Sequence, residues 1–221
     1  MVFQLNDKLW FPPAYLADDD GWLAVGGDLS VERLLLAYQN GIFPWYAFRQ
    51  SSEPRWYCPH ERFVIFPNEI HISHSMRTLL NKDKYCFSIN QAFHEVISQC
   101  SLLRINNRGA WLGQDIIDAY TEMYRRGFAS SVEVWEQPDS PNQDPQRLVG
   151  GLYGVTIGKA FFGESMFSLV PSASKLALIF LACVMEKRGG TLIDCQFKTA
   201  HLQSMGGRFI SYNEYMKLIR Q

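Results

Sequence analysis

Two carboxylates stand in stretches that otherwise read as buried β-strands. In GGTLIDCQF, Asp194 follows the strand formers Leu192 and Ile193, and Gln196 comes two positions later. Side chains two positions apart on a strand point to the same face, so Asp194 and Gln196 are predicted to lie together while Cys195 turns away. A buried carboxylate is costly unless a partner meets it. Asp194 therefore marks a candidate site.

The second acid is Glu164, in the stretch KAFFGESMFS. The same alternation predicts that Phe162, Glu164 and Met166 share a face, and Gly163 leaves room for a ligand to approach the backbone. Two acids in one small sheet favour a site for a cationic ligand, bordered by apolar groups such as Met166 and Leu152. The alternative is that each carboxylate forms an ion pair with an arginine of the same chain.

Other chemistries have weaker support. Cys195, with His201 six residues later, is a candidate thiol nucleophile, but its predicted orientation favours an inert packing residue. The run Cys58-Pro59-His60 offers two metal ligands, and nothing nearby completes a set of four. The five cysteines contain no C-x-x-C pair. We expect neither a metal nor a cofactor.

Composition and charge limit the class of protein. The 221 residues are 47% hydrophobic, which is enough to bury a sizeable core, and the net charge is −1. Residues 1–60 carry a net charge of −3 and residues 61–221 a net charge of +2, so a polyanion is expected to bind the second part. The chain has no signal-peptide pattern, and its longest apolar run, LALIFLACVM, is shorter than the about 20 residues that span a bilayer. We therefore predict a soluble, cytoplasmic protein.

The sequence predicts two parts that meet near residue 60. Residues 1–60 are turn-rich, with one helix that begins after Ser30 and ends before Gly41, and we expect a small N-terminal domain. Residues 61–221 alternate strands and helices, with QPDSPNQDPQ as a hairpin loop. Three strands in a meander, the long helix SASKLALIFLACVMEK and a further strand predict an α+β domain. Its mixed sheet should be similar to the acyl-CoA N-acetyltransferase (GNAT-like) core.

The predicted fold is typical of acyltransferases that use acyl-CoA as the acyl donor. Acetyltransferases of this shape hold pyrophosphate with a glycine-rich loop before their long helix. Here the loop reads SLVPSASK and has no glycine, which argues against acyl-CoA as the donor. A small-molecule N-acyltransferase that uses acyl-CoA nevertheless remains the alternative function.

Ordered motifs resemble those of the leucyl/phenylalanyl-tRNA–protein transferase family. They are DGWLAVGGDLS, NGIFPWY, RGAW, SSVEVW, GGLYGV, FFGESMFS and GGTLIDCQF, and they span nearly the whole chain. The resemblance implies a small N-terminal domain and an acetyltransferase-like catalytic domain that needs no metal or nucleoside triphosphate. It implies transfer of Leu or Phe, with Met as a further donor to test, from aminoacyl-tRNA to proteins with an N-terminal Arg or Lys. These proteins are thereby marked for degradation, and we expect the enzyme to be a monomer.

The resemblance also assigns roles residue by residue. Asp194 and Gln196 match the catalytic pair, and Glu164 matches the acceptor-binding acid. The aminoacyl side-chain pocket is matched by Leu152, Met166 and Ile193, and the aromatic residues beside the terminal adenosine by Trp111 and Tyr57. The chain departs from the family pattern in having Tyr57 in place of the frequent Trp, Ser130 in place of the usual His, and an insertion at residues 137–146.

The implied chemistry is aminolysis of an activated ester. About a tenth of free α-amino groups are already neutral at pH 7. The enzyme therefore needs to position its substrates more than it needs a strong base. A glutamine oxygen can accept a hydrogen bond from the amine, with Asp194 orienting Gln196. Candidates for contacts with tRNA phosphates are Arg125, Arg126 and Lys175. A non-catalytic tRNA-binding module is disfavoured by the acids on the strands.

Overall fold

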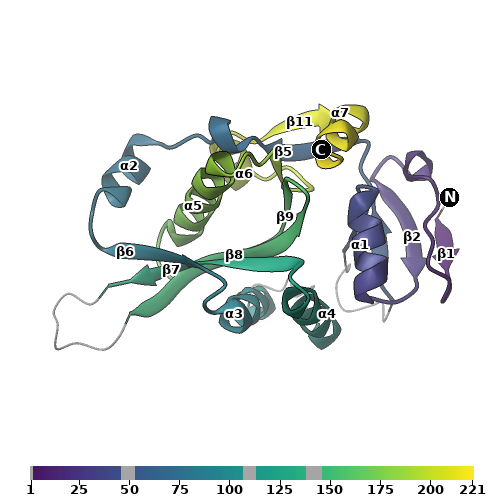
Figure 1. The fold of residues 1–221 in the computed structure, drawn as a ribbon, viewed down its shortest axis with the longest axis horizontal. Helices are drawn as coiled ribbons and strands as arrows, with labels where there is room; N and C mark the ends of the chain where they lie inside the picture. The colour runs from purple at the N-terminus through teal and green to yellow at the C-terminus, as the bar shows by residue number, and fades with distance from the viewer. Residues whose placement is uncertain (1, 46–52, 107–112, 138–145) are drawn as a thin grey trace.

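The computed structural model describes residues 2–45, 53–106, 113–137 and 146–221, and it contains two sheets (Figure 1). The first sheet has the strand order β1-β2-β4-β3. Its strands are β1 (Phe3–Leu5), β2 (Trp22–Gly26), β3 (Phe43–Pro44) and β4 (Arg55–Tyr57). Helix α1 (Val31–Gln39) is capped by Ser30, whose side chain accepts a hydrogen bond from the Arg33 N–H, as predicted. The sheet itself was not predicted, because strands of two to five residues are too short to show alternation.

The second sheet is mixed and follows the order β11-β5-β10-β9-β8-β7-β6. Its strands are β5 (Glu61–Ile65), β6 (Tyr85–Ile89), β7 (Ala129–Glu136), β8 (Arg147–Ile157), β9 (Ala160–Ser168), β10 (Leu192–Asp194) and β11 (Arg208–Ser211). Strands β9 and β10 run parallel, and the other neighbours run antiparallel. The predicted α+β fold with a mixed sheet is confirmed. Of the predicted hairpin loop, residues 138–145 lie outside the described residues, but the flanking strands β7 and β8 do pair antiparallel.

Helices cover both faces of this sheet (Figure 1). Helices α3 (Phe93–Asn106) and α4 (Gln114–Arg125) pack on one face, and α5 (Ala173–Lys187) packs on the other. The remaining helices are α2 (His74–Leu80), α6 (Ala200–Ser204) and α7 (Tyr212–Ile219). The apolar core on the α3/α4 face continues into the N-terminal sheet and α1, whereas the core under α5 is separate. Among the helices that the structure describes, none combines the length and the hydropathy of a membrane span.

A β-bulge in β9 corrects one prediction. Tyr153 of β8 pairs with Ser165, but the next residue, Gly154, pairs with Gly163, so Glu164 is the extra residue. A bulge reverses which face the later side chains point to. Phe162 therefore packs in the α3/α4 core and Met166 packs against the α5 core. The prediction that Phe162, Glu164 and Met166 share a face was wrong, because alternation cannot register the inserted residue.

A second correction concerns the end of β10. The strand ends at Asp194, so Gln196 does not share a strand face with it. Gln196 has a φ of 56°, in the left-handed region that residues other than glycine seldom occupy. The chain therefore turns sharply after the acid, directly beside the bulge of the neighbouring strand β9.

The bulge yields a stability prediction from a matched pair of glycines. A Cβ on Gly154 would overlap the carbonyl oxygen of Phe162, whereas a Cβ on Gly163 would lie 3.5 Å from the carbonyl oxygen of Asp194, an ordinary contact. We expect G154A to lower the free energy of unfolding by about 1–3 kcal/mol and G163A to change it by less than about 1 kcal/mol. Urea unfolding of both variants measures this, and equal losses would contradict the account.

Candidate active site

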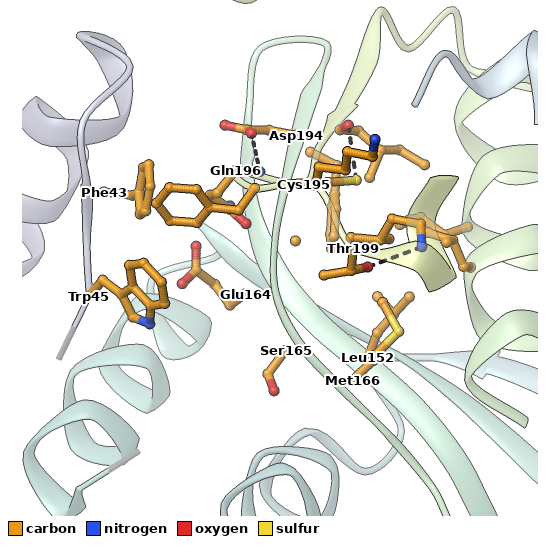
Figure 2. Close-up of a pocket in the computed structure, with 18 of the residues that line it drawn as sticks. Phe43, Trp45, Leu152, Glu164, Ser165, Met166, Asp194, Cys195, Gln196 and Thr199 are labelled. Carbon is orange, nitrogen blue, oxygen red and sulfur yellow. Dashed lines mark hydrogen bonds between the residues drawn. The ribbon is translucent and has the colours of Figure 1, made fainter. Parts of the chain in front are cut away.

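A cavity of about 390 Å³ opens where β9 and β10 separate (Figure 2). The parallel pairing runs from Leu192 opposite Ala160 to Asp194 opposite Phe162. Beyond it β9 bulges and β10 ends, so the two strands part. The cavity is lined by Phe43, Pro44, Trp45, Leu152, Phe161, Gly163, Glu164, Ser165, Met166, Leu178, Leu181, Ile193, Asp194, Cys195, Gln196, Phe197, Lys198, Thr199 and Leu202. Six of the residues singled out in the sequence thus line one cavity: Leu152, Glu164, Met166, Ile193, Asp194 and Gln196.

One end of the cavity is apolar. Leu152 and Met166 face each other across the β8–β9 pair, and Ile193 of β10 is buried beside them. Helix α5 adds Leu178 and Leu181. These residues pack within or against the core under α5, so this end is apolar and can accommodate an aliphatic or aromatic side chain.

Glu164 occupies the other side of the cavity, with Phe43 and Trp45 (Figure 2). Its carboxylate accepts hydrogen bonds from the hydroxyls of Tyr38 in α1, at 2.7 Å, and of Tyr120 in α4, at 2.9 Å. The two tyrosine hydroxyls also contact each other. Burial raises the pKa of Glu164 to about 7, against the hydrogen bonds from the two tyrosines, which lower it. This acid is therefore poised between its neutral and ionised forms near neutral pH.

Asp194 is held differently, by a closed set of partners. It is 1% exposed and accepts hydrogen bonds from the Tyr215 hydroxyl at 2.7 Å and from the backbone N–H of Gln196 at 2.9 Å. The Nε of Arg62 lies 3.8 Å from the same carboxylate. The alternative of an ion pair within the chain is thus correct for Asp194, whereas Glu164 pairs with tyrosines instead.

The Gln196 side chain is the free polar group of this turn. The Asp194 carboxylate accepts a hydrogen bond from the backbone N–H of Gln196 and not from its side-chain amide. The expectation that the acid orients the side chain directly is thereby corrected. The Nε2 atom of Gln196 is buried and has no hydrogen-bond partner in the described part of the chain. Because an unpaired buried amide is costly, it is suited to bonding a substrate placed in the cavity.

An aromatic wall closes the side of the cavity next to the N-terminal sheet. Trp45 lies 4.5 Å from Phe197 and 5.4 Å from Tyr57 between ring centroids. Phe43 lies 5.6 Å from Phe197. Tyr57 is almost fully buried behind this wall and does not line the cavity itself. The other predicted aromatic residue, Trp111, lies outside the described residues.

The competing nucleophile and metal sites find little support. Cys195 lines the cavity on the α5 side, where its side chain packs against apolar residues, and burial raises its thiol pKa well above the usual range. Such a thiol is not a thiolate at neutral pH. Across residues 2–45, 53–106, 113–137 and 146–221, no cluster of three or more His, Cys, Asp or Glu side chains could hold a metal ion.

Two of the predicted tRNA contacts are already in ion pairs. Arg126 lies 2.7 Å from Glu32 and 2.9 Å from Glu122, and Arg125 lies 3.4 Å from Glu122. Their charges are therefore largely compensated at the surface. Lys175, in the first turn of α5, remains as a candidate without an ion pair in the described part of the chain.

Four partners of the acids were missed in the sequence. Arg62 did carry a signal, since a lone cation in the apolar strand ERFVIFP requires a buried acid to meet it. Tyr38, Tyr120 and Tyr215 carried none, because a tyrosine at a buried helix position commonly serves packing alone. Their hydroxyl contacts depend on the tertiary fold.

Comparison with known proteins shows matches along almost the whole chain. A family model described as leucyl/phenylalanyl-tRNA protein transferase matches residues 64–220, and the model of its N-terminal domain matches residues 27–60. Proteins named leucyl/phenylalanyl-tRNA–protein transferase are similar. The one from Syntrophobacter fumaroxidans is 46% identical over 100% of this chain and 90% of its own length. The one from Nitrosomonas eutropha is 49% identical over 99% and 90%.

Two solved structures share the fold at low sequence identity. FemX has a TM-score of 0.53 and 9% identity, covering 86% of this chain and 71% of FemX. L-PGS from Bacillus licheniformis has a TM-score of 0.50 and 11% identity, covering 91% of this chain and 74% of that protein. At such identities the likeness concerns the fold alone.

The raised pKa of Glu164 predicts a dependence of stability on pH. Between the usual glutamate pKa of 4.5 and about 7, the folded chain keeps a proton on Glu164 that the unfolded chain loses. This contribution to stability is complete below pH 4.5 and is lost as pH rises through about 7. We expect E164Q to gain stability relative to the parent protein as pH rises from about 5 to 8.

Urea unfolding across this pH range measures the effect, with E136Q as the control. Arg147 and Lys84 lower the pKa of Glu136 through hydrogen bonds, so E136Q should keep a constant difference from the parent above about pH 6. Parallel stability profiles of E164Q and the parent would contradict the raised pKa.

Proposed function

This chain belongs to the leucyl/phenylalanyl-tRNA–protein transferase family, and we propose that it transfers leucine or phenylalanine from aminoacyl-tRNA to the N-terminal arginine or lysine of acceptor proteins. It is an enzyme of the acyltransferase class, with the aminoacyl group as the group transferred. The observation that carries the proposal is the cavity itself, which joins an apolar end to an acidic side next to Gln196.

In this proposal the donor side chain enters the apolar end. Leu152, Met166 and Ile193 form its walls, and Leu178 and Leu181 close it from α5. An uncharged, apolar pocket of this kind accepts leucine and phenylalanine through burial of apolar surface, and methionine is a further donor that fits the same chemistry.

The terminal adenosine of the tRNA is assigned to the aromatic wall. Trp45 and Phe197 present rings to the cavity, and Tyr57 supports Trp45 from behind. Stacking of a base on such rings is favourable and tolerant of base identity. The role of Trp111 beside the adenosine stays a prediction from the family motif.

The acceptor's cationic side chain is assigned to Glu164. Its carboxylate has two tyrosine donors and no ion pair in the described residues, so an arginine or lysine supplies the missing charge. A cation also favours the ionised form, so binding releases a proton at pH values near 7.

The reaction follows as direct aminolysis. The neutral α-amine of the acceptor attacks the ester carbonyl; the new C–N bond forms, the C–O bond to the tRNA ribose breaks, and the amine proton ends on the ribose oxygen. The Gln196 side-chain oxygen accepts a hydrogen bond from the attacking amine, and Asp194 keeps Gln196 in place. Placing both substrates in one cavity supplies the largest share of the rate. Neither a metal nor another cofactor takes part in these steps.

The direct test is transfer in a purified system. Leucyl-tRNA and a peptide that starts with arginine should yield the leucine-extended peptide, and mass spectrometry detects it. An acyl-CoA should not replace the tRNA, since the loop before α5 has no glycine and Ser172 enters the helix with a φ of 71° and no side-chain cap. Transfer from acyl-CoA to small amines, without transfer from tRNA, would favour the alternative of a small-molecule N-acyltransferase.

The setting of the reaction belongs to the same proposal. Charged tRNA is a cytoplasmic substrate, so we place the enzyme in the cytoplasm. One chain contains every group used above, so we expect a monomer. The extended proteins are then marked for degradation.

The acceptor assignment predicts a change in KM. E164Q should raise KM for an arginine-starting peptide by about tenfold, roughly 1.4 kcal/mol, while kcat at saturating peptide changes much less. For the parent enzyme, KM for this peptide should fall as pH rises through about 7, because the ionised fraction of Glu164 grows, and E164Q should lack this trend. An alanine-starting peptide is the control, and its KM should hardly respond to the substitution.

Direct attack predicts that the thiol in the cavity is dispensable. Cys195→Ser should keep transfer activity within about threefold of the parent, because a partly buried thiol with a raised pKa is a poor nucleophile. Cys183→Ser on α5 is a control for a general effect of removing a partly buried thiol. Isolation of an acyl-cysteine intermediate would contradict direct aminolysis.

A further inference from the structure

The Asp194–Gln196 turn is held by residues that lie outside the cavity. The hydroxyl of Tyr215, in the C-terminal helix α7, donates to Oδ2 of Asp194 at 2.7 Å. Oδ1 of Asp194 accepts the Gln196 N–H at 2.9 Å and lies 3.8 Å from Nε of Arg62. Arg62 and Tyr215 are not among the cavity-lining residues. Both are buried, so water does not replace either contact.

We propose that Tyr215 and Arg62 are positioning residues for the transfer reaction, and that they act through Asp194 on the Gln196 amide. The inference rests on the proposed function and extends it, because it makes α7, the last helix of the chain, part of what sets the rate. Neither residue contacts substrate in this account.

Tyr215 and Arg62 form one packed unit with the N-terminal part of the chain. The Arg62 guanidinium lies between two rings, 4.6 Å from the centroid of Tyr215 and 4.8 Å from that of Phe43. It also donates a hydrogen bond to the carbonyl oxygen of Gly41. Gly41 has a φ of 72°, and a Cβ there would lie 2.9 Å from the Tyr215 ring. The unit thus ties the end of α1 to Asp194.

The backbone of Gln196 needs such support. Its φ of 56° is unfavourable for a residue with a Cβ, and the Asp194 carboxylate stabilises it through an i to i+2 hydrogen bond to the backbone N–H. The orientation of the amide in the cavity follows from this backbone conformation. Any rotation of the Asp194 carboxylate away from the Gln196 N–H therefore displaces the group that contacts the amine.

Tyr215 prevents that rotation. Burial, together with the charge of Asp194, raises the pKa of Tyr215 well above its usual value, so its hydroxyl keeps the proton it donates. Without the hydroxyl, Oδ2 of Asp194 loses its donor, and Arg62 is the remaining positive group within reach of the carboxylate. With one oxygen unbonded, the carboxylate can rotate about its Cβ–Cγ bond, which breaks the contact between Oδ1 and the Gln196 N–H.

The test compares two tyrosines of the same helix. Tyr215→Phe removes the hydroxyl but keeps the ring beside Arg62, and Tyr212→Phe removes a hydroxyl that donates to the Asn40 carbonyl oxygen at 3.3 Å. With leucyl-tRNA and an arginine peptide, Y215F should lower kcat by about 10- to 100-fold, with both KM values within about threefold of the parent. Y212F should stay within about threefold of the parent in every parameter.

A second readout separates positioning from loss of stability. Both variants are assayed at least about 15 °C below their measured Tm, so the folded fraction is the same. A crystal structure of Y215F should show Gln196 out of the left-handed region or the Asp194 carboxylate rotated away from the Gln196 N–H. If Y215F does not fold, Arg62→Lys, which retains the buried charge but loses the fork that reaches Gly41, should show the same selective fall in kcat.

The outcomes distinguish the two proposals. If the parent enzyme extends the peptide and folded Y215F has an unchanged kcat, or loses kcat no more than Y212F, the positioning role is wrong and the proposed function stands. A rise in KM without a fall in kcat would equally overturn it, since that pattern indicates substrate binding. If the parent enzyme transfers nothing from leucyl-tRNA, the proposed function is wrong, and the positioning role that rests on it is wrong too.

Discussion

The desolvation of one carboxylate governs the arrangement around this site. Asp194 ends a three-residue strand inside the protein, where an unpaired charge would be very costly. Three groups stabilise the carboxylate: the Arg62 guanidinium from β5, the Tyr215 hydroxyl from α7 and the backbone N–H of Gln196 in the following turn. Each partner comes from a different element, so all of these elements must be in place before the acid is satisfied.

Glu164, on the neighbouring strand β9, is stabilised in a different way. Its donors are two neutral phenols, and burial raises its pKa to about 7. The charge of Asp194 is thus compensated by Arg62 of the same chain, whereas Glu164 has no cationic partner among the described residues. Two acids on neighbouring strands can therefore perform different tasks: one fixes the geometry of a turn, and the other is available to a cation from outside. The difference lies in the partners and not in the acids.

The sequence predicts the elements of this site better than it predicts their geometry. The mixed sheet, the α5 helix and both acids follow from the order of strands and helices, the apolar run of α5 and the depletion of acids in strands. The bulge at Glu164 and the left-handed turn at Gln196 do not, because each depends on how β9 and β10 part in three dimensions. The partners Tyr38 and Tyr215 lie more than a hundred residues and about twenty residues from their acids, so local patterns cannot connect them.

The same two irregularities produce the cavity. A regular parallel pair would place the side chains of β9 and β10 in contact and close the sheet at this point. The extra residue in β9 and the early end of β10 separate the strands, and the opening spans both faces of the sheet, from the α5 core to the N-terminal aromatic wall. An apolar group can then enter on one face while a cation is held on the other. Because the backbone irregularities that make this opening also set the position of Gln196, the cavity and its polar group form one structural feature, and the buried partners of Asp194 stabilise both together.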